Sequence, residues 1–130
     1  MERSIISTKN APAAIGPYVQ ANKVGDFIFT SGQIPLDPET GEIKAVTFED
    51  QAVRVFKNLQ AVLEAAGSGL DSVIKTTVYL TDIGDFAKMN EIYAEFFNGP
   101  MLPSRTAIEV SHLPKDVLVE AEVIAITSMV

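Results

Sequence analysis

Two charged residues of this chain, Arg105 and Glu120, have the types and the setting for chemistry. Only three arginines stand against seventeen acidic residues, and Arg105 opens an alternating run that predicts a strand. Its planar guanidinium matches a carboxylate through two parallel hydrogen bonds. Arg105 could therefore bind an acidic substrate, or it could form a structural ion pair with Glu109, Glu120 or Glu122.

Glu120 interrupts a second apolar run, between Val119 and Ala121. A carboxylate in such surroundings is either paired or has a raised pKa. It could be the partner of Arg105, or it could position a water molecule and take its proton. Glu122 is the competing candidate for this role, because it lies two residues further along and faces the same side of the strand.

Weaker signals come from uncharged or singly occurring residues. Tyr18 follows a Gly-Pro turn that would aim its hydroxyl, although an ordinary half-buried tyrosine is the alternative. Gly32, after Ser31, indicates that the backbone closely approaches another group. Asn90 lies beside the apolar stripe of an expected helix, where exposed polar residues are common. His112 is the only histidine, which argues against a histidine-based metal site, and it is interpreted as structural.

The composition restricts the classes of function. A length of 130 residues, with 47% hydrophobic and 21% charged residues, predicts one globular domain over residues 1–130. A net charge of −7 without a basic cluster argues against a nucleic-acid partner. The absence of cysteine excludes disulfides, thiolate nucleophiles and cysteine-based metal sites. With no signal-peptide pattern and no membrane-length apolar run, we expect no membrane partner and a cytoplasmic location.

Two helices and five strands should position these residues. Helical periodicity covers residues 48–66 and 86–97, and strands are expected at residues 18–24, 27–34, 74–80, 105–110 and 117–126. Thr47, with Asp50 three residues later, resembles a capping box at the first helix, and Gly67 is placed to end it. Asp82 is the expected N-cap of the second helix.

This order of elements predicts an α+β fold. Right-handed crossovers would place both helices on one face of a mixed sheet. In the last strand both faces are largely apolar, whereas a half-exposed strand should alternate between apolar and polar residues. Because two helices cover only one face, we expect another subunit to cover the second. The chain should then be a homo-oligomer with sites at or beside its interfaces.

Several long segments resemble the Rid (YjgF) family, and specifically its RidA branch, in the same order and nearly end to end. These segments are residues 10–20, 30–35, 73–79, 85–90, 103–105 and 113–117, followed by Glu120. The resemblance implies a chorismate-mutase-like fold, assembled as a homotrimer with three intersubunit clefts. It also implies hydrolysis of reactive 2-imino acids, and of the enamines in equilibrium with them, to 2-keto acids and ammonia without cofactor or metal. RidA-type members favour 2-iminopropanoate and 2-iminobutanoate.

The resemblance also implies roles for individual residues. Arg105 would bind the substrate carboxylate, and Glu120 would hold the attacking water. The rest of the pocket would comprise Tyr18, Ser31, Gly32 and Asn90. Many RidA relatives have a cysteine where this chain has Ala107. In the family the backbone carbonyl of that residue helps to hold the water, and a carbonyl is retained here.

Two alternatives to the deaminase remain open. Ala107, together with a connection at residues 98–102 that is shorter than in some relatives, leaves room for a non-catalytic trimer that binds small acids or acts like a chaperone. A ribonuclease or translation-inhibitor activity has been attached to some relatives. The net charge of −7 and the lack of a basic patch weigh against it.

Overall fold

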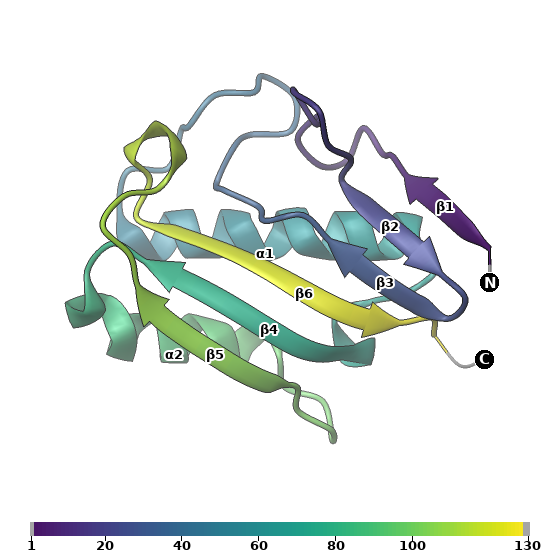
Figure 1. The fold of residues 1–130 in the computed structure, drawn as a ribbon. Helices are drawn as coiled ribbons and strands as arrows, with labels where there is room; N and C mark the ends of the chain where they lie inside the picture. Colours follow the sequence, from purple (N-terminus) through teal and green to yellow (C-terminus); the bar gives the residue numbers. More distant parts are fainter. Residues whose placement is uncertain (1, 129–130) are drawn as a thin grey trace.

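One mixed sheet of six strands, in the order β1-β2-β3-β6-β4-β5, forms the frame of the molecule (Figure 1). The computed structural model describes residues 2–128. Its strands are β1 (Arg3–Ile6), β2 (Ala21–Val24), β3 (Phe27–Thr30), β4 (Val73–Leu80), β5 (Ser104–Glu109) and β6 (Val119–Ile126). Only β4 and β5 pair in parallel. Two helices, α1 (Phe48–Ala65) and α2 (Phe86–Phe96), lie on one side of the sheet, so the expected α+β architecture is confirmed.

Helix α1 begins and ends where the sequence predicted. The Thr47 side chain accepts a hydrogen bond from the backbone N–H of Asp50 at 3.1 Å, which satisfies one of the free donors at the helix start. Gly67 follows the helix with a φ of +79°, a left-handed conformation that glycine adopts at low cost. The apolar face of α1 packs against β6 and α2.

The expected start of the second helix at Asp82 is wrong. The carboxylate of Asp82 accepts a hydrogen bond from the N–H of Gly84, only two residues on, at 2.8 Å. This bond caps a short 3-10 turn, Ile83–Asp85, and α2 begins after it at Phe86. A side chain that caps a tight turn delays the α-helical hydrogen bonds by about one turn.

The strand predictions need three corrections. β1 was not foreseen, and the first hairpin is shorter than expected, because β2 begins only at Ala21 and β3 ends at Thr30. Beyond Thr30 the chain leaves the ladder, although Gln33 still forms an isolated bridge to Ala121 of β6. The last strand begins at Val119 because a 3-10 turn, Pro114–Asp116, occupies the preceding residues.

The two faces of the sheet differ in their cover. Along β6 the odd-numbered residues are buried beneath the helices, and the even-numbered residues are half-buried on the other side, named here the open face. The odd-numbered and even-numbered residues of β6 therefore lie on opposite faces of the sheet, and the even-numbered side is only half covered within one chain. Apolar side chains also populate the open face: Phe27, Phe29, Tyr79, Ile108, Ile124 and Ile126. Cover of this face by a second subunit stays a prediction.

Candidate functional site

Glu120 projects from β6 on the open face, directly beneath an irregular segment of backbone. The N–H of Gln33 donates to the carbonyl of Ala121 at 2.8 Å, and the N–H of Ala121 donates back at 3.2 Å. This bridge lays Gly32 over Glu120 so closely that a Cβ on Gly32 would collide with Glu120 Oε2. The close approach predicted at Gly32 is thus to a carboxylate.

The two neighbouring glutamates of β6 have different surroundings. The Tyr79 hydroxyl donates to Glu122 Oε1 at 2.6 Å; this bond, with burial and the nearby negative charges, raises the pKa of Tyr79 to about 12. Burial, and to a smaller degree the charge of Glu122, raises the pKa of Glu120. No side-chain hydrogen bond or ion pair recorded among residues 2–128 engages Glu120. Glu120 is therefore better placed than Glu122 to act as a base.

Tyr18 and Ser31 come together through a turn in the segment before β2. The Ser31 hydroxyl donates to the carbonyl of Val19 at 2.6 Å, so it fastens this segment to the end of β3. The N–H of Tyr18 donates to the carbonyl of Gly16, whose φ is +134°. A side chain at position 16 would press on the Tyr18 ring at 3.3 Å. The turn leaves the Tyr18 side chain half-exposed, as a site residue requires.

A recess of about 370 Å³ joins these residues and is called here the Glu120 recess. Its lining includes Tyr18, Ser31, Gly32, Ile34, Leu36 and Glu120. Four residues that the sequence singled out thus lie together, and we name Tyr18, Ser31, Gly32 and Glu120 the Glu120 group.

Arg105 lies on the edge strand β5 and faces helix α2, not the open face. Its Nη1 donates to Asn90 Oδ1 at 2.7 Å. Its guanidinium carbon lies 4.8 Å from the ring centroid of Tyr93 and 5.5 Å from that of Phe86. Cation–π contacts of this kind hold a guanidinium in one orientation. The sequence pattern showed both rings only as part of a helical stripe and did not indicate this contact.

The backbone of β5 carries unpaired groups beside Arg105. The N–H of Val110 donates to Leu80 of β4 at 2.7 Å. Because successive residues of a strand direct their backbone groups to opposite sides, those of Arg105 and Ala107 face away from β4, at the edge of the sheet. The carbonyl of Ala107 is therefore available to a ligand. We name Arg105, Asn90 and Ala107 the Arg105 group.

The two groups cannot meet within one chain. Thr76 of β4 pairs with Arg105 on one side and with Val123 on the other, and Glu120 lies three residues from Val123. Strand spacing and rise then separate the Cα atoms of Arg105 and Glu120 by about 14 Å. Their side chains also occupy opposite faces of the sheet. The alternative of an ion pair between them is therefore wrong for the single chain.

Four further expectations concern residues outside the two groups or sites of other kinds. Glu109 accepts a hydrogen bond from the N–H of Ile83 at 2.9 Å and does not pair with Arg105. His112 is exposed, with its Nε2 3.8 Å from Asp116 Oδ1, and belongs to neither group. Within residues 2–128 no cluster of three or more potential metal ligands occurs. No helix in that range has the length and apolar character needed to cross a membrane.

Comparison with known proteins gives consistent matches along nearly the whole chain. Residues 8–127 match the profile of the family described as Endoribonuclease L-PSP. A RutC family protein of Pyrococcus abyssi is 58% identical over 125 residues, which cover 96% of this chain and 98% of that protein. TdcF of Escherichia coli, named as a reactive intermediate deaminase, is 48% identical over 128 residues, covering 97% and 98%. The crystal structure of E. coli TdcF with bound serine superposes with a TM-score of 0.91 at 47% identity, covering 96% of this chain and 99% of that one.

Proposed function

Because the chain belongs to the Endoribonuclease L-PSP family, the family of the YjgF/Rid proteins, we propose that it hydrolyses reactive 2-imino acids. The preferred substrates would be 2-iminopropanoate and 2-iminobutanoate, and the products a 2-keto acid and ammonia. The name of TdcF supports a deaminase, and the serine in its crystal structure supports a small-molecule ligand. The proposal requires no cofactor, metal or nucleic acid.

The observation that carries the proposal is the complementary charge of the two groups. Arg105 is held by Asn90 and two aromatic rings but by no carboxylate among residues 2–128. Glu120 is a half-buried carboxylate to which no cation is paired in the same range. Since the two cannot meet in one chain, we propose that copies of the chain complete each other's sites in the three clefts of a homotrimer.

The Arg105 group would bind and orient the substrate. Nη1 of Arg105 donates to Asn90 Oδ1 and approaches Met89 Sδ at 3.9 Å, so the N–H groups of Nε and Nη2 remain to hold the carboxylate of an imino acid. A charge-assisted contact of this kind contributes roughly 1.5–3 kcal/mol, which is enough to fix the orientation of a small acid. Because the guanidinium already stacks on Tyr93 and Phe86, little side-chain entropy is lost when the substrate binds.

The Glu120 group would supply the chemistry. Glu120 takes a proton from a water molecule, and the water oxygen attacks C2 of the substrate. The C=N electron pair moves to the nitrogen, which takes the proton back from Glu120, and a tetrahedral carbinolamine forms. Glu120 then transfers the hydroxyl proton to the amino nitrogen, the C–N bond breaks as the keto C=O bond forms, and ammonia leaves. Because its pKa is raised, Glu120 is a stronger base than a free glutamate. The Ala107 carbonyl of the partner copy would help to hold the water.

A direct assay tests the proposal. A pyridoxal-phosphate-dependent dehydratase acting on threonine or serine would generate 2-iminobutanoate or 2-aminoacrylate in situ, and release of the 2-keto acid would be followed with and without the protein. We expect release to be accelerated. A rate equal to the spontaneous one would contradict the proposal. Binding of a stable 2-keto acid without such acceleration would favour the non-catalytic, acid-binding alternative.

A further inference from the structure

Asn58 is a polar residue in a position that the pattern of helix α1 reserves for apolar side chains. It lies three residues after Val55 and four before Val62, and all three side chains are completely buried. A buried amide is costly unless each of its polar atoms is hydrogen-bonded. The amide of Asn58 must therefore have hydrogen-bond partners inside the protein.

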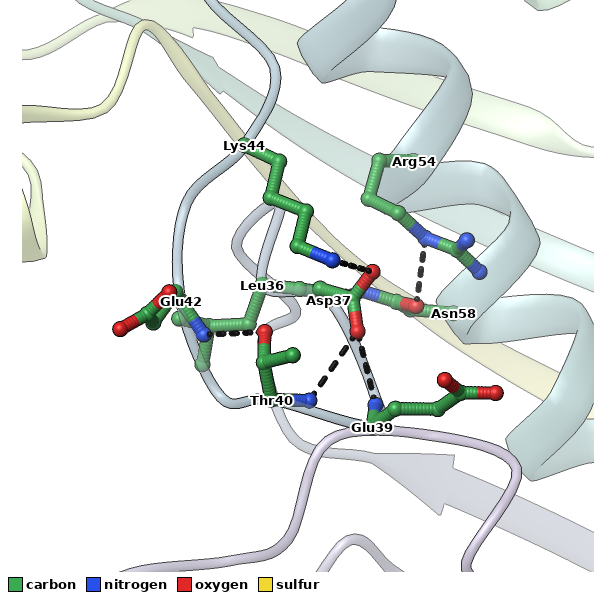
Figure 2. Close-up of polar contacts among 8 residues, drawn as sticks. All are labelled: Leu36, Asp37, Glu39, Thr40, Glu42, Lys44, Arg54 and Asn58. Carbon is green, nitrogen blue, oxygen red and sulfur yellow. Dashed lines mark hydrogen bonds and ion pairs between the residues drawn. The ribbon is translucent and has the colours of Figure 1, made fainter.

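The amide of Asn58 is fully used, and its main partners are backbone carbonyls of a distant segment. Its Nδ2 donates to Ile34 O at 3.2 Å and to Leu36 O at 3.0 Å, and its Oδ1 accepts from Arg54 Nε at 3.0 Å. Figure 2 shows Arg54 and Asn58 on α1, facing the loop that contains Leu36 and Asp37. The bond from Arg54 fixes which side of the amide is the oxygen.

The loop that follows this segment is closed by its own hydrogen bonds. The N–H of Asp37 donates to Glu42 O at 2.8 Å, and Asp37 Oδ1 accepts from the N–H groups of Thr40 and Glu39. These backbone donors hold the pKa of Asp37 below its ordinary value, and Lys44 Nζ lies 3.5 Å from Oδ2 (Figure 2). The loop is thus stiff in itself. Gln51 of α1 holds its far end by donating to Ala45 O at 3.1 Å, and the end nearer the recess needs a separate anchor.

Asn58 provides that anchor at the wall of the site. Ile34 and Leu36 line the Glu120 recess, and they follow Gly32, which lies on the Glu120 carboxylate. No other side chain among residues 2–128 donates a recorded hydrogen bond to either of their carbonyls. The position of this apolar wall relative to Glu120 is therefore determined from the helix side by one amide.

We infer that Asn58 is a positioning residue, which holds the Ile34–Leu36 wall of the Glu120 recess and thereby sets the size of the side chain that an acidic substrate can carry. An apolar wall can discriminate between substrates that differ by a methylene group only if the wall does not move when the larger substrate binds. A wall held by two hydrogen bonds to a buried side chain of α1 resists the displacement that a longer chain would require. The inference rests on the proposed function only for its choice of ligands.

The test compares Asn58→Leu, which has a similar volume but no donors, with two other variants of the full-length chain. Arg54→Met removes the bond to Asn58 Oδ1 but keeps both donors to the wall. Ser68→Ala is the matched control, because Ser68 is also buried and donates to a backbone carbonyl, Ile126 O, at 2.6 Å, but does not line the recess. Amide hydrogen exchange would be measured by residue, and binding of pyruvate, 2-oxobutanoate and 4-methyl-2-oxopentanoate by calorimetry.

In Asn58→Leu we expect faster exchange at residues 33–37 and a roughly tenfold loss of preference for the short over the branched keto acid. Arg54→Met should show a smaller change of the same kind, and Ser68→Ala should leave the preference unchanged. Unchanged exchange, or a preference in Asn58→Leu that matches Ser68→Ala, would overturn the inference. A wild-type protein that binds keto acids but does not hydrolyse imines would refute the proposed function alone. One that hydrolyses imines but does not discriminate between the short and the branched keto acid would overturn the inference alone.

Discussion

The Arg105 group and the Glu120 group are built in different ways. Arg105, Asn90 and Ala107 lie on an edge strand and a helix, where regular hydrogen bonds and two aromatic rings fix them. In the Glu120 group only Glu120 itself lies on a strand. The rest of the recess is made by irregular segments on both sides of the first hairpin and by Pro114 of the 3-10 turn before β6. The first group offers a cation and unpaired backbone at a sheet edge, and the second offers a carboxylate inside a shaped recess.

This difference separates binding from chemistry. A guanidinium stacked on Tyr93 and Phe86 is pre-organised, so it suits the part of the substrate that does not change during the reaction. A carboxylate whose pKa is raised by burial suits the step in which a proton moves. Variants of the two groups should therefore fail in different ways.

The largest effect should come from Glu120→Gln, which keeps the shape of the side chain but removes the base. We expect kcat to fall by about 10²- to 10⁴-fold with little change in KM.

The same variant should also change the stability. Because burial raises the pKa of Glu120, the ionised Glu120 carboxylate destabilises the fold above that pKa. This destabilisation is absent below the ordinary pKa of glutamate, where the carboxyl is protonated in both the folded and the unfolded chain. The variant should thus have a higher Tm than the wild type at neutral pH, and the same Tm at low pH. Equal activity would remove Glu120 from the mechanism.

Arg105→Met should cause the next largest loss, and mainly in KM. Removing the anchor of the carboxylate should lower kcat/KM by roughly 10- to 150-fold, because the contact exists in both the bound substrate and the transition state. Lys88→Met is the control, since it removes a positive charge from the same helix region, where Lys88 only approaches Glu49 at 3.8 Å on the surface. A kcat effect as large as that of Glu120→Gln would contradict the separation of roles.

Mixing the two impaired variants, assayed at a substrate concentration well below KM, tests whether the groups come from different copies. If each site combines Arg105 of one copy with Glu120 of another, subunit exchange between Arg105→Met and Glu120→Gln should restore activity at about a quarter of the sites. Each restored site would take its arginine from one variant and its glutamate from the other. Imine hydrolysis would be measured after partial unfolding and refolding of the mixture. Activity no greater than the sum of the separate variants would indicate that no intact site forms between copies.

The sequence predicted those features that depend on local periodicity. The limits of α1 and its cap at Thr47 follow from spacing within one element, and both are confirmed. The close approach of the Gly32 backbone to another group could also be predicted, because a glycine can be recognised in a single sequence. Such signals need no knowledge of which elements become neighbours.

The features that were missed depend on which elements become neighbours. The side of the sheet that Arg105 occupies is set by the register of β5 on β4, which no local pattern specifies. The stacking on Tyr93, and the role of Asn58 beneath the Glu120 recess, also arise only when distant segments pack together. The sequence did contain one indication of the role of Asn58, because it is a polar residue within the apolar stripe of helix α1.

The smallest predicted effect concerns the pH dependence of the Glu120 group alone. Besides burial, the charge of Glu122 contributes to the raised pKa of Glu120, so Glu122→Gln should lower that pKa without restoring its ordinary value. The acid limb of the pH profile of kcat/KM should move to lower pH, because Glu120 then stays deprotonated down to a lower pH.

The control variant Tyr79→Phe removes the hydrogen bond to Glu122 but not the charge of Glu122, and it should not move the acid limb to lower pH. A limb that stays in place in Glu122→Gln would leave burial as the sole cause, and a limb that moves in both variants would show that the hydrogen bond from Tyr79, and not only the charge of Glu122, tunes the base.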